Sequence, residues 1–202
     1  MSGIPLLVEP AGLRVLIVGG GAVALRKAKQ LAQMGAQLRV VAPVVSEELE
    51  ALLHDRGSTV ERREYATGDI DDAQLVFAAT NDKLVNAQVA SDADAENRLV
   101  NVTDLSEGGN FSVMATHHRG ALTIGVSAGG VSAAALRIRD AIAERFDARY
   151  GDALHELAQL RRRLLASGDT AAWKERSAAL IDDDFCDLVE QGRLAQKIAP
   201  WP

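Results

Sequence analysis

Three glycines near the start of the chain have the types and spacing that bind a dinucleotide. The largely apolar run at residues 13–18 leads into Gly19, Gly20 and Gly21, and an alanine-rich helical segment begins near Ala22. In a Gly-x-Gly-x-x-Ala turn the first glycine permits the tight bend, and the second leaves room for a pyrophosphate at the helix N-terminus. The pattern predicts a dinucleotide site. A glycine turn that serves packing alone is the alternative.

The predicted cofactor contacts extend to the ends of the second and fourth strands. The fingerprint expects an acid about 20 residues after the glycines. The second strand is instead followed by Pro43 and Val44, which we expect to contact adenosine through main chain and apolar surface. Arg39 precedes this end and is either a 2′-phosphate contact or a solvated side chain. Residues 78–81 either contact the nicotinamide half or form a turn in which Asn81 caps a helix. The predicted set is Gly19, Gly21, Ala22, Val23, Pro43, Val44 and Thr80.

Asp104 is the predicted catalytic residue. It follows the fifth predicted strand, at the edge where open α/β sheets bind ligands, and its carboxylate can accept a proton. A cap of the following loop is the alternative. His117 and His118 are second candidates, because an unperturbed imidazole titrates at about pH 6.5; on the predicted hairpin tip, plain solvent exposure is the alternative. No stable metal site is predicted, and Asp104 is the one residue expected to hold a metal transiently.

Strands and helices alternate through the first half of the chain, which predicts an α/β, Rossmann-like parallel sheet. The later strands are expected at residues 38–42, 59–63, 75–79 and 99–102, and the helices at 46–56, where Ser46 is a possible cap, and 83–96. Two strands at 111–116 and 121–127 follow, joined across 117–120. A helix comes next, with Leu136, Ile138, Ile142 and Phe146 toward one side, and residues 151–202 are helical.

The predicted organisation has three parts. Residues 1–112 form a NAD-binding domain, 113–150 a small α+β dimerisation region, and 151–202 a helical C-terminal region. Residues 111–150 are too few for a core of their own, so they need the main sheet or a second subunit. A homodimer is therefore expected.

Composition is that of an ordinary soluble enzyme. The chain has 202 residues, of which 48% are hydrophobic and 25% charged, and no apolar run reaches the roughly 18 residues of a membrane span. No membrane association and a cytoplasmic location are expected, since the N-terminus lacks a signal peptide pattern. The net charge of −6 argues against nucleic-acid binding. The single cysteine, Cys186, excludes an intrachain disulfide and is expected to be half-buried on a helix.

Six motifs together resemble one enzyme family. They occur in its order and spacing at residues 18–27, 35–43, 78–82, 101–104, 110–111 and 127–132. Each motif is common, but the set is similar to the precorrin-2 dehydrogenase/sirohydrochlorin ferrochelatase family, which includes the N-terminal module of siroheme synthase. The resemblance extends to about residue 150 and, in outline, over the helical tail.

The resemblance implies oxidation of precorrin-2 to sirohydrochlorin with NAD and, in many members, insertion of ferrous iron to give siroheme. It implies a homodimer, makes Asp104 the counterpart of the family's catalytic aspartate, and suggests substrate contacts at Asn110, His117 and Ser127. The methyltransferase domain that is fused to some relatives is not expected in this protein, so another protein is expected to supply precorrin-2. Precorrin-2 is a polycarboxylate, for which Arg119, Arg137 and Arg139 are further candidate contacts.

Two departures and two alternatives accompany this interpretation. Ala128 stands where the family often has Ser or Thr, and Ala133 where it often has proline, which bears on the chelatase activity and on substrate contacts. A NAD(H)-sensing regulatory module with a helical partner-binding tail is the main alternative function. A chelatase that keeps the nucleotide fold only as a scaffold is the other.

Overall fold

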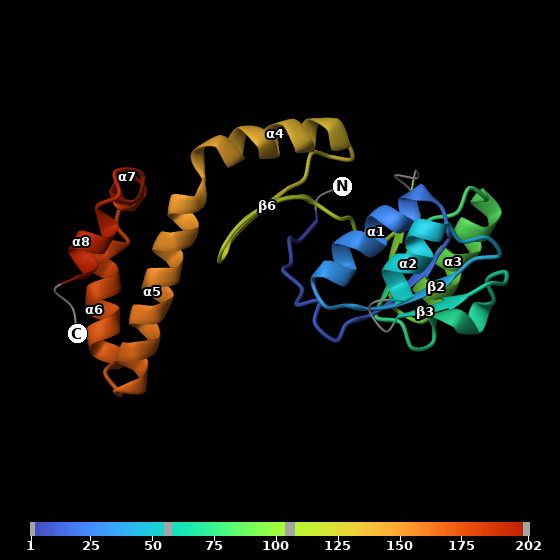
Figure 1. Cartoon of the computed structure of the whole chain (residues 1–202), viewed down its shortest axis with the longest axis horizontal. Coiled ribbons are helices and arrows are strands. Elements are labelled where there is room, and N and C mark those ends of the chain that lie inside the picture. The colour runs from blue at the N-terminus through green and yellow to red at the C-terminus, as the bar shows by residue number, and fades with distance from the viewer. Residues whose placement is uncertain (1–2, 55–57, 104–107, 200–202) are drawn as a thin grey trace. The chain divides into compact units, whose positions relative to one another are not determined.

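The structure, a computed structural model, describes residues 3–54, 58–103 and 108–199. These residues fall into two compact units that divide between Val113 and Met114 (Figure 1).

The N-terminal unit is built on a five-stranded parallel sheet with the order β3-β2-β1-β4-β5. This order confirms the predicted Rossmann-like fold. Because β1 and β4 lie side by side while the chain reaches β2 first, the strand order reverses beside the glycine turn that follows β1. The strands are β1 (Arg14–Val18), β2 (Gln37–Val41), β3 (Thr59–Glu61), β4 (Leu75–Ala78) and β5 (Leu99–Val102).

Both faces of the sheet are buried. Val15 and Ile17 pack with α1 (Ala22–Gln33) and α2 (Glu47–His54), which lie side by side on one face (Figure 1). Leu16 and Val18 face the other way, toward α3 (Lys83–Ala95) and the short 3-10 helix η1 (Thr67–Ile70). Burial on both sides explains why β1 is apolar at every position from Val15 to Val18 instead of alternating between apolar and polar residues.

The predicted elements of this unit are present with small shifts at their ends, but the predicted helix caps are wrong. Asp82, not Asn81, caps α3: its Oδ1 atom accepts hydrogen bonds from the N–H groups of Leu84 (2.8 Å) and Val85 (3.3 Å). The hydroxyl of Ser46 does not cap α2, since it is buried without a hydrogen-bond partner among the described residues.

The C-terminal unit joins a hairpin to a set of helices. The antiparallel strands β6 (Ala115–Arg119) and β7 (Leu122–Val126) precede α4 (Ser132–Arg145), and α5 (Ala148–Ala166) and α6 (Thr170–Leu180) run side by side (Figure 1). Two short helices follow, α7 (Phe185–Glu190) and α8 (Leu194–Ile198). Leu157, Leu160 and Leu164 are buried in the helical core, as their spacing predicts, and Cys186 is half-buried on α7.

The hairpin differs from the sequence-based expectation. The predicted strand at 111–116 and loop at 117–120 are wrong: β6 continues to Arg119, and the turn is formed at Gly120, whose φ of +55° suits glycine. Phe111 instead packs edge-on against Phe77 in the N-terminal unit, with ring centroids 5.5 Å apart. The predicted border at residue 151 falls within α5, so the division into 113–150 and 151–202 stays a prediction.

The helix α4 is largely uncovered. Ala135 is its one buried residue, and the side chains of Leu136 and Ile138 are 43% and 48% exposed. Ile142 and Phe146 are half-buried, so the four residues predicted to lie toward one side differ in their exposure. The uncovered apolar residues mean that this chain alone does not bury the apolar surface of α4.

Candidate functional site

A cavity of about 970 Å³ lies at the carboxyl ends of the parallel strands. Its walls come from the glycine turn, the ends of β2 and β4, the start of α3 and the segment after β3. Ligands of open α/β sheets bind at this edge, where the strand order reverses. All seven residues predicted to contact the cofactor line this cavity.

The three glycines of the turn have different surroundings. A Cβ atom on Gly19 would stand 2.3 Å from the carbonyl oxygen of Ala79, and one on Gly20 would stand 2.1 Å from that of Val44. A Cβ atom on Gly21 would meet nothing within 4 Å. Gly19 and Gly20 are thus needed for close backbone packing, whereas the open side of Gly21 lies in the cavity. Gly20 was not among the predicted residues, although the unbroken run of three glycines was a signal for it.

The start of α1 suits an anionic group. Gly21 caps the helix without a side-chain hydrogen bond, and the first turn carries no acidic side chain. The N–H groups of Ala22 and Val23 have no partner within a helix at these positions, and the helix dipole adds partial positive charge. A pyrophosphate fits beside Gly21, because there is neither a Cβ atom nor a carboxylate in its way.

The end of β2 carries no acid, as the sequence indicates, and Arg39 is hydrogen-bonded to two carboxylates. Its Nε atom donates to Glu61 (2.7 Å), and its Nη2 atom donates to the buried Asp69 (2.6 Å). The hydrogen bond from Arg39 lowers the pKa of Glu61, and a hydrogen bond from Arg63 lowers the pKa of Asp69. Arg39 is therefore not the freely solvated side chain that was one expectation, and its pairing with two carboxylates outside the cavity lining does not favour the other, a 2′-phosphate contact.

The end of β4 is held rigidly by Asn86. The Thr80 hydroxyl donates to Asn86 Oδ1 (2.8 Å), and Asn86 Nδ2 donates back to the Thr80 carbonyl oxygen (3.0 Å). Asn86 is buried, so this pair fixes the turn that forms one wall of the cavity. The side chain of Thr80 therefore helps to fix the shape of this wall of the cavity.

The segment after β3 forms a wall of the cavity, and none of its residues was among the predicted cofactor contacts. Glu64 and Tyr65 both line the cavity. The Tyr65 hydroxyl donates to Asp92 of α3 (2.9 Å), whose other oxygen accepts from Gln88 (2.7 Å), and burial raises the pKa of Tyr65. The position of Glu64 just beyond the third strand was a usable signal, because carboxyl ends of parallel strands share one edge.

The predicted catalytic and substrate residues divide between the two units. Asp104 lies outside the described residues; Thr103, before it in the sequence, donates its N–H to the Ala78 carbonyl oxygen (3.0 Å). Asn110 accepts from the Val100 N–H (2.8 Å) and donates to the Arg98 carbonyl oxygen (2.8 Å). Its amide therefore extends the pairing of β5, and its substrate contact stays a prediction.

The histidines do not sit on a hairpin tip. His117 is only 5% exposed within β6, and its Nε2 atom lies 2.6 Å from the carbonyl oxygen of Phe146. His118 contacts the Thr123 hydroxyl across the hairpin (3.1 Å). The expectation of a solvent-exposed His117 is wrong, and its substrate role, like that of the exposed Ser127 after β7, stays a prediction.

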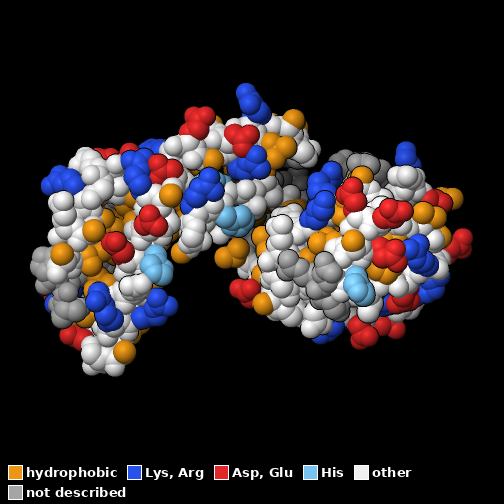
Figure 2. All heavy atoms as spheres, viewed as in Figure 1, with side chains coloured by type: hydrophobic (Ala, Val, Ile, Leu, Met, Phe, Trp, Pro, Cys, Tyr) orange, Lys and Arg blue, Asp and Glu red, His pale blue; other side chains and the backbone are white. Residues whose placement is uncertain are grey.

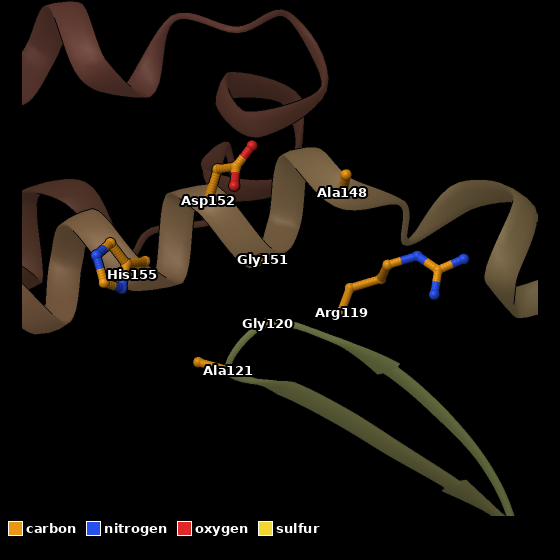
Figure 3. A pocket seen from close by; sticks show the side chains of 7 residues that line it. All are labelled: Arg119, Gly120, Ala121, Ala148, Gly151, Asp152 and His155. Atoms are coloured by element: carbon orange, nitrogen blue, oxygen red, sulfur yellow. The ribbon is translucent and has the colours of Figure 1, made fainter.

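A second cavity, of about 340 Å³, lies between the hairpin turn and α5. Figure 3 shows that Arg119, Asp152 and His155 point in different directions around it. The turn packs on the helix through glycines, since a Cβ atom on Gly151 would stand 2.7 Å from the Arg119 carbonyl oxygen. This cavity therefore lies beside a close backbone contact, and the side chains around it do not converge on one point where a ligand would bind.

The described residues include no candidate membrane-spanning helix and no metal-binding cluster. None of the helices they form is long and apolar enough to cross a membrane. They contain no group of three His, Cys, Asp or Glu side chains placed to hold a metal ion. Figure 2 shows acidic and basic side chains interspersed over the visible face of both units.

The whole chain is similar to siroheme synthases and to a precorrin-2 dehydrogenase of known structure. The siroheme synthase of Pseudomonas entomophila (strain L48) is 37% identical over 202 residues, and that of Azotobacter vinelandii is 41% identical over 199. Each alignment covers 98% of this chain but 41% of the relative, so the chain spans about two fifths of the length of these relatives. The solved structure of "SirC, precorrin-2 dehydrogenase" matches with a TM-score of 0.79 and 28% identity, over 98% of this chain and all of that one.

A family model also matches the unit that holds the larger cavity. The model, NAD_binding_7, is described as "Putative NAD(P)-binding" and covers residues 6–115, more than half of the chain. The match includes the glycine turn and the ends of β2, β3 and β4 that line the cavity. With this match and the geometry of the turn, the chain belongs to the NAD(P)-binding family.

Proposed function

We propose that this protein oxidises precorrin-2 to sirohydrochlorin with NAD, as a step of siroheme biosynthesis. The observation that carries the proposal is the likeness to SirC, a precorrin-2 dehydrogenase, because it extends over the whole length of both chains. The similarity to siroheme synthases over 98% of the chain supports the same pathway. The cavity with its open Gly21 side supports the proposal, because it leaves room for a dinucleotide beside the glycine turn.

The residues around the cavity have distinct roles in this proposal. The N–H groups of Ala22 and Val23 bind the pyrophosphate beside Gly19 and Gly21. Pro43 and Val44 contact the adenosine, and the turn at Thr80 holds the nicotinamide half. Bound NAD supplies the hydride acceptor of the reaction. Since Arg39 is engaged by Glu61 and Asp69, no arginine at the end of β2 is free for a 2′-phosphate, which favours NAD over NADP.

Asp104 is the proposed proton acceptor. Oxidation removes two hydrogens from the macrocycle, one as a hydride and one as a proton, and the proton needs a base. In the sequence Asp104 directly follows Thr103, whose N–H donates a hydrogen bond to the Ala78 carbonyl oxygen at the end of β4. Asn110, His117 and Ser127 are the proposed substrate contacts.

We further propose a homodimer that covers α4. The uncovered side chains of Leu136 and Ile138 lie in the region predicted from the sequence to dimerise, and burial of such surface drives association. The siroheme synthase relatives favour a second activity, insertion of ferrous iron into sirohydrochlorin. Ala128, in place of a hydroxyl residue, bears on that activity. A cytoplasmic location stays a prediction.

An anaerobic assay tests the function directly. Precorrin-2 is incubated with the protein, with and without NAD, and formation of sirohydrochlorin and NADH is followed by absorbance. We expect both products in equal amounts and only with NAD. Binding of NAD without any oxidation of precorrin-2 would instead support the regulatory module. Ferrous iron is then added to measure siroheme formation.

A further inference from the structure

We propose that Glu64 binds the adenosine ribose of NAD and disfavours the 2′-phosphate of NADP. Dinucleotide sites of this fold usually take the ribose hydroxyls on an acid at the end of the second strand. Here that place holds Pro43 and Val44, neither of which carries an acceptor side chain. Glu64 lines the same cavity from the neighbouring strand and supplies the missing carboxylate.

The sheet brings Glu64 to the adenosine half of the site. β3 pairs with β2 in parallel, with Val41 opposite Glu61, and the Ala42 N–H donates to the Glu61 carbonyl oxygen (3.1 Å). The chain then turns over the carboxyl edge and reaches Glu64 three residues later. β2 and β3 lie on the side of β1 away from β4, and the phosphates bind at β1. Glu64 therefore stands where the adenosine end of the cofactor lies.

The backbone around Glu64 is fixed, but its carboxylate is free. Arg63 Nη1 donates to the Glu64 carbonyl oxygen (2.9 Å) and to Asp69 (2.7 Å), so it does not neutralise the Glu64 side chain. On the other side, Tyr65 is anchored to Asp92. Glu64 itself makes no side-chain hydrogen bond or ion pair with any residue that the structure describes. A positioned, unpaired carboxylate suits hydroxyl donors and repels a phosphate.

A second polar group lies unused in the same cavity. The Ser46 hydroxyl is buried and has no hydrogen-bond partner among the described residues, although Ser46 lines the cavity. Its N–H donates to the Gly20 carbonyl oxygen (2.9 Å), so Ser46 adjoins the glycine turn. Buried polar groups usually have a partner. A ligand on the β2 side of the turn would supply one for Ser46.

Calorimetric titration of the full chain with NAD and NADP tests the role of Glu64. Glu64→Gln keeps the size of the side chain but removes its charge. We expect the Kd for NAD to rise about tenfold, the loss typical of a charge-assisted hydrogen bond. The Kd for NADP should stay the same or fall, so the preference for NAD over NADP decreases at least tenfold. Glu96→Gln is the matched control, because Glu96 is exposed at the far end of α3 and lies outside the cavity lining.

Deamino-NAD, in which the adenine amine is replaced, separates the ribose from the base. If Glu64→Gln weakens deamino-NAD and NAD equally, the carboxylate acts on the ribose; a loss confined to NAD would assign it to the adenine amine and overturn the proposal. Unchanged binding of both dinucleotides by the variant would also overturn it. The inference concerns NAD binding alone, so failure of precorrin-2 oxidation would leave it standing.

Discussion

Gly20 and Val44 touch through their backbones: a Cβ atom on Gly20 would stand 2.1 Å from the Val44 carbonyl oxygen. Real Cβ atoms do not approach a backbone oxygen so closely, so a side chain here must push the glycine turn and the end of β2 apart. Gly20→Ala should therefore lower the free energy of unfolding by about 1–3 kcal/mol, as overpacking does. Urea denaturation measures the loss.

Gly21→Ala is the matched control for that prediction. Gly21 has a φ of −93°, which any residue adopts, and open space where its Cβ atom would stand. The free energy of unfolding should stay within about 0.5 kcal/mol of the original. Equal losses for the two alanine variants would show that close packing does not distinguish the glycines.

Gly21→Asp should leave the protein folded but abolish NAD binding. The added carboxylate would stand beside α1, where the helix N-terminus is expected to bind the pyrophosphate. Calorimetry should detect no binding at NAD concentrations that saturate the unchanged protein, while circular dichroism stays the same. Retained affinity would mean that the glycine turn serves packing alone.

Asp69→Asn should destabilise the N-terminal unit at neutral pH. Asp69 is buried and accepts hydrogen bonds from Arg39, from Arg63 and from the Ala66 N–H (2.9 Å), so the loss of its charge should cost about 1–3 kcal/mol. The pKa of Asp69 is lowered in the folded state, chiefly by Arg63. Its stabilisation is therefore fully present above the unfolded pKa of about 3.9 and is lost as the pH falls through the folded value.

Unfolding of both proteins across a pH series checks this sign. The difference in the free energy of unfolding between Asp69→Asn and the unchanged protein should be constant from about pH 6 to about pH 8. It should shrink below about pH 4. A difference that grows on acidification would contradict the lowered pKa.

Leu136→Asp should convert the proposed homodimer to a monomer. Leu136 is 43% exposed on α4, and a carboxylate buried against a second subunit is costly. Light scattering should report about twice 21.5 kDa for the unchanged protein and about 21.5 kDa for the variant. Leu84→Asp is the control, since Leu84 is 82% exposed in the N-terminal unit. A monomeric unchanged protein would remove the basis for this interface.

The sequence predicted the sheet better than the walls of its cavity. The apolar runs and the three glycines mark the strands and the turn, because burial on both faces requires continuous apolar strands. The hydrogen bonds of Arg39 with Glu61 and Asp69 join residues far apart in the sequence, so no local sequence pattern predicts them. His117 looked like a turn residue because polar residues favour turns, whereas its contact with Phe146 stabilises it within a strand.

Asp104→Asn should bind NAD normally but lose most of the proposed dehydrogenase activity. The amide has nearly the same size as the carboxylate and cannot accept a proton at neutral pH. Because general acid–base groups supply about 10²- to 10⁴-fold in rate, a loss in that range is expected in single turnovers. Asp94→Asn is the control, since Asp94 is exposed on α3 outside the cavity lining. Turnover at the original rate would mean that another group takes the proton.

Iron insertion by the same variant, measured from sirohydrochlorin, separates the two proposed activities. If Asp104 serves both, oxidation and insertion should fall together, because one carboxylate accepts the proton and contacts the metal. If insertion persists while oxidation is lost, other groups receive the iron. No insertion by the unchanged protein would make this chain a dedicated dehydrogenase, and Ala128→Ser would then test whether a hydroxyl at that position restores insertion.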